Sequence, residues 1–583
     1  MKRAILFVVL WAVAANAQIN PDSLKSDIKF LASDRLQGRL TGSPQAADAA
    51  EWIAGKFKAY GLIPAVPEYF QKYDFNSKAV LGKNNSLAFF VKGKQFAARL
   101  HSDYVPYVFS DSGKVKSPLV FAGYGISAKD SSYDDYAGID VKGKAVLIMR
   151  GSPEEDSTNA RLYRFSPTRM KLMAARDKGA AVVLVANGKE DKSLAKFEYD
   201  YSSRAGVPVV NISYAFAKRV LIASGFDLEK ALAKIEKTQE PNSSLIKRVE
   251  VSISVDISIL GTKAINVAGM VAPPIISDST FYVIGAHYDH LGWGPYGSMA
   301  PDTIAIHHGA DDNASGVAGL LELARYYGSH PQLVKKPILF VSFSGEEEGL
   351  LGSQYFVEHP PVDKSKVAAM LNMDMVGRLR NDKLIIGGIG SALQWEGLVK
   401  TLDVELGKDS LKLSLDMAGF GPSDHASFYV KSIPVLFFFT DVHSDYHKPS
   451  DTYDKVNYVG EERVVTFVKS IIDSLQEARW VPTYAKVVAA EKPSGGPRVY
   501  LGTIPDFGSQ ANGYKLSGVT PGSPAEKAGL KGGDVITKIG DKGIKNIYDL
   551  TYVLQELKPG EKVVVEYIRD GKKTKTDVVV GRK

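Results

Sequence analysis

The chain has 583 residues, of which 45% are hydrophobic and 23% are charged, an ordinary globular composition that excludes a disordered or fibrous protein. At about 100–200 residues per domain, this length predicts roughly three or four domains. The chain contains no cysteine, which excludes disulfides, thiolate zinc sites, iron–sulfur clusters and a cysteine nucleophile. Any metal must therefore be bound by His, Asp or Glu.

The formal net charge of +7 is small for this length and unevenly distributed. Lys2 and Arg3 supply two positive charges, residues 498–583 carry 15 basic and 10 acidic residues, and the residues between are neutral overall. Because the excess belongs to the two ends, it does not indicate nucleic-acid binding, and we expect no nucleic-acid partner.

The first 17 residues have the pattern of a secretory signal peptide. A basic start precedes an apolar run at 4–14, and Ala15-Asn16-Ala17 has the small-residue spacing of a cleavage site. This run is too short to span a bilayer core of about 30 Å, and no later stretch reaches about 18 apolar residues. We therefore expect an exported protein, periplasmic or extracellular, without stable membrane insertion.

The elements predicted after residue 17 change in character along the chain. Residues 46–60 have apolar side chains at helical spacing, and short β-rich runs appear from about residue 105. From about residue 262, apolar strands alternate with amphipathic helices. The predicted strands are Phe281–Ile284, Ile338–Phe343, Ala368–Asn372 and Pro434–Phe439, and the predicted helices include Gly316–Tyr327 and Arg463–Leu475.

This alternation predicts an α/β fold with a mixed, mostly parallel sheet flanked by helices, plus a β-rich insert and a small terminal domain. A Pro- and Gly-rich tract at 492–497 indicates a linker. The expected division is a signal peptide at 1–17, the α/β domain at 18–104 and 256–483, the insert at 105–255, the linker at 484–497 and the small domain at 498–583.

Five short clusters of metal-ligating side chains follow the predicted strands or lie in adjoining loops. They are His287-Tyr288-Asp289-His290, Gly309–Gly316, Glu346-Glu347-Glu348, Asp374 and Tyr446-His447. Because α/β sheets bind ligands at the carboxyl ends of their strands, one site could gather all five. Two histidines with several carboxylates form a ligand set typical of catalytic zinc or a similar divalent ion.

These clusters closely resemble the co-catalytic di-zinc aminopeptidases of the bacterial secreted and vacuolar type, with glutamate carboxypeptidase and the transferrin receptor as more distant relatives. The resemblance covers essentially the whole α/β part, and Gly38-Arg39 with Thr41-Gly42-Ser43 looks like the family's N-terminal segment. The matching stretches are His287-Tyr288-Asp289, Gly309–Gly316, Glu346-Glu347, Gly349–Ser353, Asn372–Met375, Ser423-Asp424-His425 and Tyr446-His447.

The resemblance implies two zinc ions about 3.5–4 Å apart, bridged by Asp312. His287 and Asp374 would complete one site, and Glu347 and His447 the other. It leaves the neighbouring His290, His307 and His308 outside the ligand set.

The resemblance also implies three further roles. Glu346 would act as the general base on a zinc-bound water and pass the proton to the leaving amine. Asp289 would hold the second ring nitrogen of His287, and Tyr446 would steady the tetrahedral oxyanion. His425 would shape the pocket or support a ligand.

The two accessory modules also resemble known domains. Phe121–Gly125, Val141–Lys144 and Pro208–Val210 resemble a protease-associated domain, which would either restrict substrate access to the cleft or serve as a purely structural lid. Val519–Ala525 and Ala528–Ile536 resemble a PDZ domain, with Tyr500–Ile504 as the candidate carboxylate-binding loop. This domain would either bind the C-terminus of a peptide or have a structural or oligomeric role.

The function expected from the resemblance is a zinc exopeptidase, specifically an aminopeptidase acting on peptide substrates. Two enzyme alternatives on the same fold are a glutaminyl cyclase, which uses one zinc, and a carboxypeptidase of the glutamate-releasing kind. A non-catalytic binding protein requires lost ligands, whereas all five ligand positions and Glu346 are present here.

Overall fold

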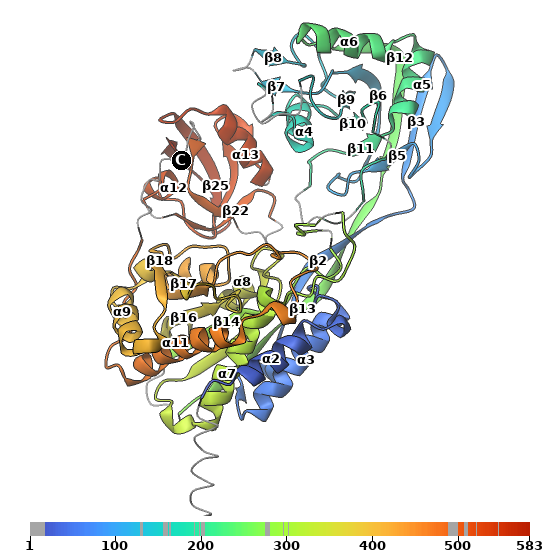
Figure 1. Cartoon of the computed structure of the whole chain (residues 1–583). Coiled ribbons are helices and arrows are strands. Elements are labelled where there is room, and N and C mark those ends of the chain that lie inside the picture. The colour runs from blue at the N-terminus through green and yellow to red at the C-terminus, as the bar shows by residue number, and fades with distance from the viewer. Residues whose placement is uncertain are drawn as a thin grey trace, which may run out of the picture.

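The computed structural model describes residues 18–583 except 129–131, 155–160, 163–164, 192, 198, 200–203, 274–279, 295, 301, 488–498, 506–510, 521, 546 and 583. The expected signal peptide and most of the expected linker lie outside the described residues. Figure 1 shows an α/β domain, an inserted domain joined to it by long strands, and a small domain between the two.

The α/β domain is built on a nine-stranded sheet in the order β1-β13-β15-β14-β16-β19-β17-β18, with β2 paired to β13. Strands β15, β14, β16 and β19 run parallel, and β13 and β17 join them antiparallel, which confirms the mixed, mostly parallel sheet. The strands are β1 Ile63–Pro64, β2 Phe70–Leu81, β13 Ile257–Val271, β14 Phe281–His287, β15 Ile338–Phe343, β16 Val367–Met373, β17 Lys383–Gly387, β18 Lys412–Leu415 and β19 Val435–Phe439.

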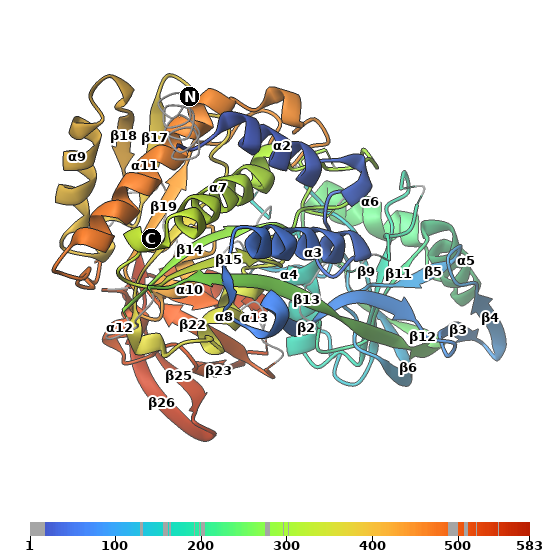
Figure 2. The same cartoon turned by 90° about the horizontal axis from the view of Figure 1, so that it is seen from below.

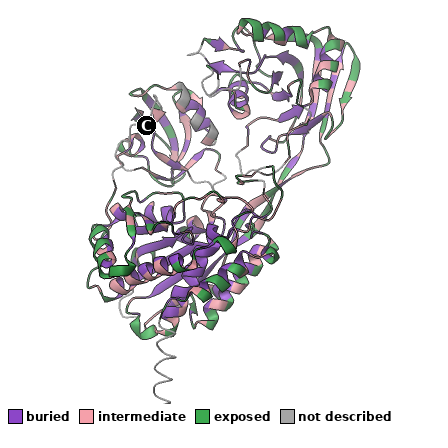
Figure 3. Ribbon diagram, viewed as in Figure 1, coloured by how far each residue is buried: buried purple, intermediate pink, exposed green. Residues whose placement is uncertain are grey.

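Helices cover both faces of this sheet because alternate strand residues point to opposite layers. In β14, Tyr282 and Ile284 join the core under α2, α3, α7 and α11, whereas Phe281 and Val283 pack with residues of α8 and α10. Figure 2 shows the first helical layer, and Figure 3 shows the buried strands between the layers. The helices are α2 Pro21–Leu31, α3 Pro44–Ala59, α7 Gly316–Ser329, α8 Leu351–Glu358, α9 Trp395–Glu405, α10 His425–Tyr429 and α11 Tyr458–Glu477, and η5 is a π-type turn at Ala310–Ser315.

The inserted domain contains an eight-stranded sheet in the order β4-β3-β12-β6-β9-β10-β11-β5. Its first strands precede residue 105, because β3 pairs with β12 and β4 pairs with β3. The expected boundary at 104/105 therefore lies inside this sheet. Its elements are β3 Ser86–Val91, β4 Lys94–Ala98, β5 Tyr104–Pro106, β6 Gly113–Phe121, β7 Ser127–Ala128, β8 Tyr133–Asp134, β9 Ala145–Met149, α4 Thr168–Asp177, β10 Val182–Ala186, β11 Val209–Ile212, α5 Tyr214–Ser224, α6 Leu228–Thr238 and β12 Ser244–Val255.

The small domain has a sheet in the order β21-β22-β23-β25-β26, all antiparallel, with β24 paired to β23. Its elements are β20 Val499–Tyr500, β21 Thr503–Pro505, β22 Tyr514–Val519, α12 Pro524–Lys527, β23 Val535–Ile539, β24 Lys542–Gly543, α13 Ile547–Glu556, β25 Lys562–Arg569, β26 Lys572–Val579 and β27 Gly581–Arg582. Among the described residues, no helix is long and apolar enough to cross a bilayer.

The small domain contacts both of the other parts. Met170 and Met173 of α4 belong to the same apolar cluster as its core, and Arg176 donates a 2.7 Å hydrogen bond to the buried Asp549 of α13. On the other side, Ile504 of the edge strand β21 and Val430 of the α/β domain line a cavity of about 40 Å³. The small domain thereby connects the inserted domain to the α/β domain.

We predict that Asp549→Asn loosens the contact between the inserted and small domains. The substitution keeps the side-chain size but removes the charge that pairs with Arg176. Because a buried group deprived of its partner costs about 1–3 kcal/mol, α4 and α13 should exchange their amide hydrogens faster in the full chain. Asp541→Asn, in an exposed turn of the same domain, is the matched control. Unchanged exchange in α4 of Asp549→Asn would contradict the prediction.

Candidate metal centre

The predicted clusters lie at the carboxyl edge of the four parallel strands. His287 is the last residue of β14, Asp374 directly follows β16, and Glu346-Glu347 follow β15 after two residues. Asp312 lies in η5, in the connection from β14 to α7, and His447 lies in the loop after β19. The parallel arrangement therefore brings five segments that are distant in sequence to one edge of the sheet.

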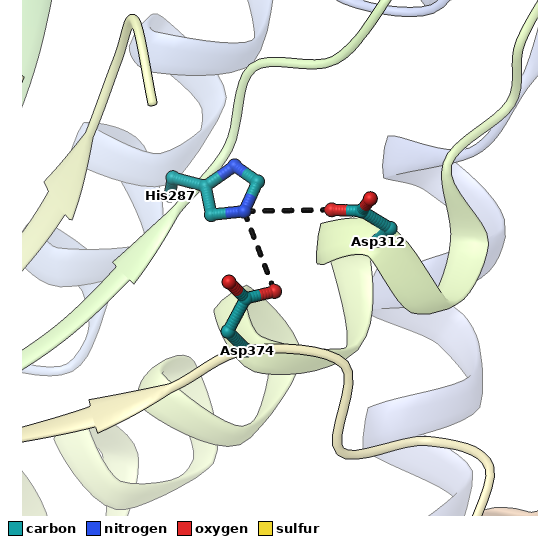
Figure 4. A group of neighbouring side chains, drawn as sticks. All are labelled: His287, Asp312 and Asp374. Carbon is teal, nitrogen blue, oxygen red and sulfur yellow. Dashed lines mark ion pairs between the residues drawn. The ribbon is translucent and has the colours of Figure 1, made fainter. Parts of the chain in front are cut away.

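The first group consists of His287, Asp312 and Asp374, as Figure 4 shows. His287 Nε2 lies 3.4 Å from Asp312 Oδ1 and 3.4 Å from Asp374 Oδ1. The His287 side chain is only 1% exposed, and Asp374 Oδ1 is buried without a hydrogen-bond partner among the described residues. Three potential metal-ligand atoms, one nitrogen and two oxygens, thus converge at distances long for hydrogen bonds. This is the arrangement expected of the ligands of a metal ion.

The second group lies on the other side of Asp312. His447 Nε2 lies 3.1 Å from Asp312 Oδ2 and 3.3 Å from Glu347 Oε2. The Nδ1 atom of His447 is 2.8 Å from the Gly297 carbonyl, which fixes the ring if Nδ1 carries the proton and leaves Nε2 facing the carboxylates. His290, Asp312 and Glu347 also form a group that could hold a metal, with His290 Nδ1 2.7 Å from Glu347 Oε1.

The two oxygens of Asp312 face different groups, so its carboxylate is shared between them. Imidazole nitrogens and carboxylate oxygens suit zinc, and a shared carboxylate is the element that a two-metal site requires. The unpartnered Asp374 Oδ1 fits the same interpretation, because buried carboxylate oxygens are otherwise hydrogen-bonded. The residues present therefore fit a pair of divalent cations.

Burial and the crowding of carboxylates control the protonation of this site. Burial, followed by the charges of Asp374 and Glu347, raises the pKa of Glu346 well above its usual range. Burial would lower the pKa of His447, but its contacts with Asp312 and Glu347 raise it to about 11. For Glu347, burial is outweighed by hydrogen bonds with His290 and His447, and its pKa is lowered.

The residues predicted to assist the metals also lie here. Glu346 Oε2 is 3.9 Å from His287 Nε2, and the Tyr446 ring stacks on His447 with ring centroids 3.9 Å apart. The carboxylate of Asp289 is less close to His287 than expected, at 3.7 Å from Nδ1, whereas the Asp289 carbonyl is 3.3 Å away. This carboxylate instead accepts hydrogen bonds from the backbone amides of Glu346 and Glu347.

Among the histidines set aside on family grounds, only His290 joins a potential metal group among the described residues. Its position three residues after His287, just beyond a strand end, was the available signal. His307 contacts Ser298, and His308 contacts Asp34. His425 stacks on Phe437, and burial lowers its pKa to about 3, so it is neutral at neutral pH.

Two further residues support the site without having been singled out from the sequence. Asp451 Oδ2 accepts the backbone amides of Asp311 and Asp312, which fixes the backbone that carries the shared carboxylate. His443 Nε2 lies 3.2 Å from Asp311 Oδ2. Both side chains come from the loop after β19, where neither strand pattern nor helical periodicity marks them.

Comparison with known proteins gives the same assignment for each part. Residues 266–471 match peptidase family M28, 115–220 match the PA domain and 505–580 match the PDZ domain. The α/β part of the chain is therefore similar to the peptidases of family M28, the insert to the PA domain and the small domain to the PDZ domain. This confirms the family and the two modules that the sequence motifs resemble.

Two protein sequences and one solved structure are similar to this chain. Aminopeptidase YwaD of Bacillus subtilis is 28% identical over 360 residues, covering 60% of this chain and 64% of YwaD. The uncharacterized protein YfbL of Escherichia coli is 29% identical over 298 residues, covering 43% of this chain and 88% of YfbL. The solved structure of an aminopeptidase from Aneurinibacillus sp. strain AM-1 has 23% identity and a TM-score of 0.47, covering 82% of this chain and 99% of that protein.

We predict that the centre binds zinc more tightly as the pH rises. The raised pKa of His447 means that a proton occupies this ring at neutral pH, and a metal ion must displace it. Raising the pH weakens that competition, so apparent affinity should rise by roughly tenfold per pH unit for each displaced proton. Chelator-competition titrations of metal-free protein at three values between about pH 6 and 8 measure this dependence.

The matched control for this titration is His359→Gln, because His359 is exposed beyond the end of α8. The variant should keep both the affinity and its pH dependence. A zinc affinity that does not change with pH would contradict the proton displacement.

Proposed function

We propose that the chain is a zinc-dependent aminopeptidase that removes N-terminal residues from peptides. The observation that carries this proposal is the single Asp312 carboxylate shared between two histidine–carboxylate groups, with Glu346 beside them. The name of YwaD, an aminopeptidase, supports the activity, although the match spans less than two thirds of that protein.

In this proposal, two zinc ions are held by five side chains. Asp312 would be a ligand of both, His287 and Asp374 would complete one site, and Glu347 and His447 would complete the other. We favour His447 over His290 because His447 Nε2 approaches both Asp312 and Glu347, whereas His290 forms one 2.7 Å contact with Glu347. His290 then orients the Glu347 carboxylate from its far side.

The zinc pair would polarise the peptide carbonyl and lower the pKa of water. Glu346 takes the proton from the attacking water and gives it to the leaving amine. The pKa of Tyr446 is also raised, first by burial and then by Asp312, so its hydroxyl stays protonated and can donate to the developing oxyanion. Asp289 keeps the backbone of Glu346 and Glu347 in place.

We also propose the remaining assignments on sequence grounds. The protein is exported after removal of residues 1–17, and its domains divide as the sequence indicates, except that β3 and β4 pair with the sheet of the insert. Its substrates are peptides. The PA domain either limits their access or acts as a structural lid, and the PDZ domain either binds a peptide C-terminus or has a structural or oligomeric role.

We predict that Glu346→Gln retains zinc and loses turnover. The amide is similar in size but cannot accept the proton, and general base catalysis contributes about 10²–10⁴-fold. Metal analysis together with kcat on an aminoacyl substrate measures both properties. Glu396→Gln, a half-exposed position on α9, is the control and should retain activity. Substantial residual turnover by Glu346→Gln would remove Glu346 as the base, and a single bound metal at full activity would exclude the two-zinc site.

We predict that a free N-terminal amine is required for cleavage. A charged amine can form a charge-assisted hydrogen bond with the carboxylates of the site, and acetylation removes it. Losing such an interaction costs about 1.5–3 kcal/mol, so kcat/KM should fall by roughly 10–100-fold or more. Matched peptides with free and acetylated N-termini make the comparison, and a third peptide amidated at its C-terminus should be cleaved normally. Equal cleavage of the first two would refute the aminopeptidase assignment.

A further inference from the structure

The segment Gly38–Thr41 lies directly against the loops that carry the proposed ligands. Leu40 forms a β-bridge with His290, the Gly292 amide donates to the Gly38 carbonyl at 3.0 Å, and the His290 amide donates to the Arg39 carbonyl at 3.3 Å. The segment is thus joined by backbone hydrogen bonds to the chain that follows His287.

Gly38 packs closely against the backbone of Gly292 and His307. Its φ of +73° is left-handed, and a Cβ atom there would lie 2.5 Å from the carbonyl oxygens of both Gly292 and His307. Only glycine allows that approach. The glycine places Arg39 and Thr41 beside the metal centre.

Arg39 connects the two ligand loops through its guanidinium group, which is fully buried. Its Nε donates to the Tyr288 carbonyl at 2.6 Å, immediately after His287. Its Nη2 donates to the Gly309 carbonyl at 2.9 Å, at the start of the turn that carries Asp312. Because the guanidinium is planar and rigid, it fixes the distance between these two backbone segments.

The other guanidinium nitrogen anchors the same group to its surroundings. Arg39 Nη1 donates to the Leu31 carbonyl at 2.5 Å and to the His308 carbonyl at 2.8 Å. The former lies at the end of α2, and the latter precedes Gly309. Arg39 is therefore held between the N-terminal helix and the Asp312 loop, with carbonyl partners on every nitrogen.

Thr41 reaches the third ligand loop through Asp289. Its buried hydroxyl donates to Asp289 Oδ2 at 2.9 Å. The same carboxylate accepts the amides of Glu346 and Glu347, each at 3.3 Å. Thr41 thus orients the carboxylate that holds the loop bearing the proposed base and the ligand Glu347.

We propose that Arg39 and Thr41 are positioning residues of the metal centre. Arg39 sets the separation of the His287 and Asp312 loops, and Thr41 orients Asp289 beneath Glu346 and Glu347. Neither side chain contacts a metal in this scheme; both act by keeping the ligands in place before the metal arrives. The inference rests on the metal binding in the proposed function, but it does not depend on the substrate.

The test measures zinc affinity of the metal-free full chain by chelator competition. Thr41→Val removes the hydroxyl at nearly constant volume. Arg39→Lys keeps the charge but loses the planar guanidinium that donates to the carbonyls of both Tyr288 and Gly309. Since removing a partner of a metal ligand reduces metal affinity by about 10–100-fold, each variant should show a loss in that range. Thr41→Ser restores the hydroxyl and should bind zinc within about twofold of the unmodified chain.

Two controls separate positioning from general stability. Thr238→Val removes a hydroxyl bonded to Lys234 on α6, and Arg463→Lys alters a guanidinium that binds Asp382 and the Ser410 carbonyl. Both should retain zinc affinity. Thermal unfolding of each metal-free variant is recorded alongside, because the proposal expects Thr41→Val to lose affinity while its metal-free unfolding temperature stays close to that of the unmodified chain.

The zinc affinities of the variants can contradict the positioning roles of Arg39 and Thr41. Thr41→Val with unchanged zinc affinity refutes the role of Thr41, and a loss that Thr41→Ser fails to restore does the same. Arg39→Lys with unchanged affinity refutes the role of Arg39; if that variant does not fold, Thr41→Val still decides the proposal. If the unmodified chain binds zinc but cleaves no aminoacyl substrate, the proposed function fails while this inference stands.

Discussion

The cost of burying several carboxylates together is the constraint on which the rest of the structure depends. Five acidic side chains, those of Asp289, Asp312, Glu346, Glu347 and Asp374, meet at one sheet edge with little exposure to water. Unpaired buried charges are strongly unfavourable, and hydrogen bonds to backbone amides and histidines offset only part of this cost. Divalent cations would offset the remainder, so metal binding and the stability of this edge are linked.

The sequence predicted the elements whose patterns are local. Ile338–Phe343 was predicted with its observed ends, and β14, β16 and β19 with ends within three residues, because near-continuous apolar runs mark strands buried on both faces. The order of ligands after strands then indicated the metal centre. Contacts of high sequence separation were not predictable: nothing local relates Thr41 to Asp289, or Asp451 to Asp312. The strand at which the inserted sheet begins was not predictable either, because β3 follows β2 directly and joins the inserted sheet only through its long-range pairing with β12.

The PDZ domain contacts both the inserted domain and the α/β domain. Its helix α13 holds α4 through a buried ion pair, and its edge strand β21 faces the α/β domain. A peptide that adds to a PDZ domain pairs with an edge strand, and the candidate carboxylate-binding loop Tyr500–Ile504 leads into β21. Peptide binding there would use the same strand that faces the α/β domain. Of the roles left open for this domain, peptide capture and a structural role would therefore depend on the same strand.

The distance along the chain between Arg39 and its partners also orders events during synthesis. Arg39 precedes Tyr288 by 249 residues and Gly309 by 270, with the whole PA domain between them. At about 5–20 residues per second, roughly 12 to 50 s pass before the first of these carbonyls is made. During that interval the inserted sheet has all of its strands and can fold, whereas the metal centre lacks every ligand. The metal centre is accordingly assembled after the inserted domain, although Arg39 and Thr41, which support it, are among the first residues made.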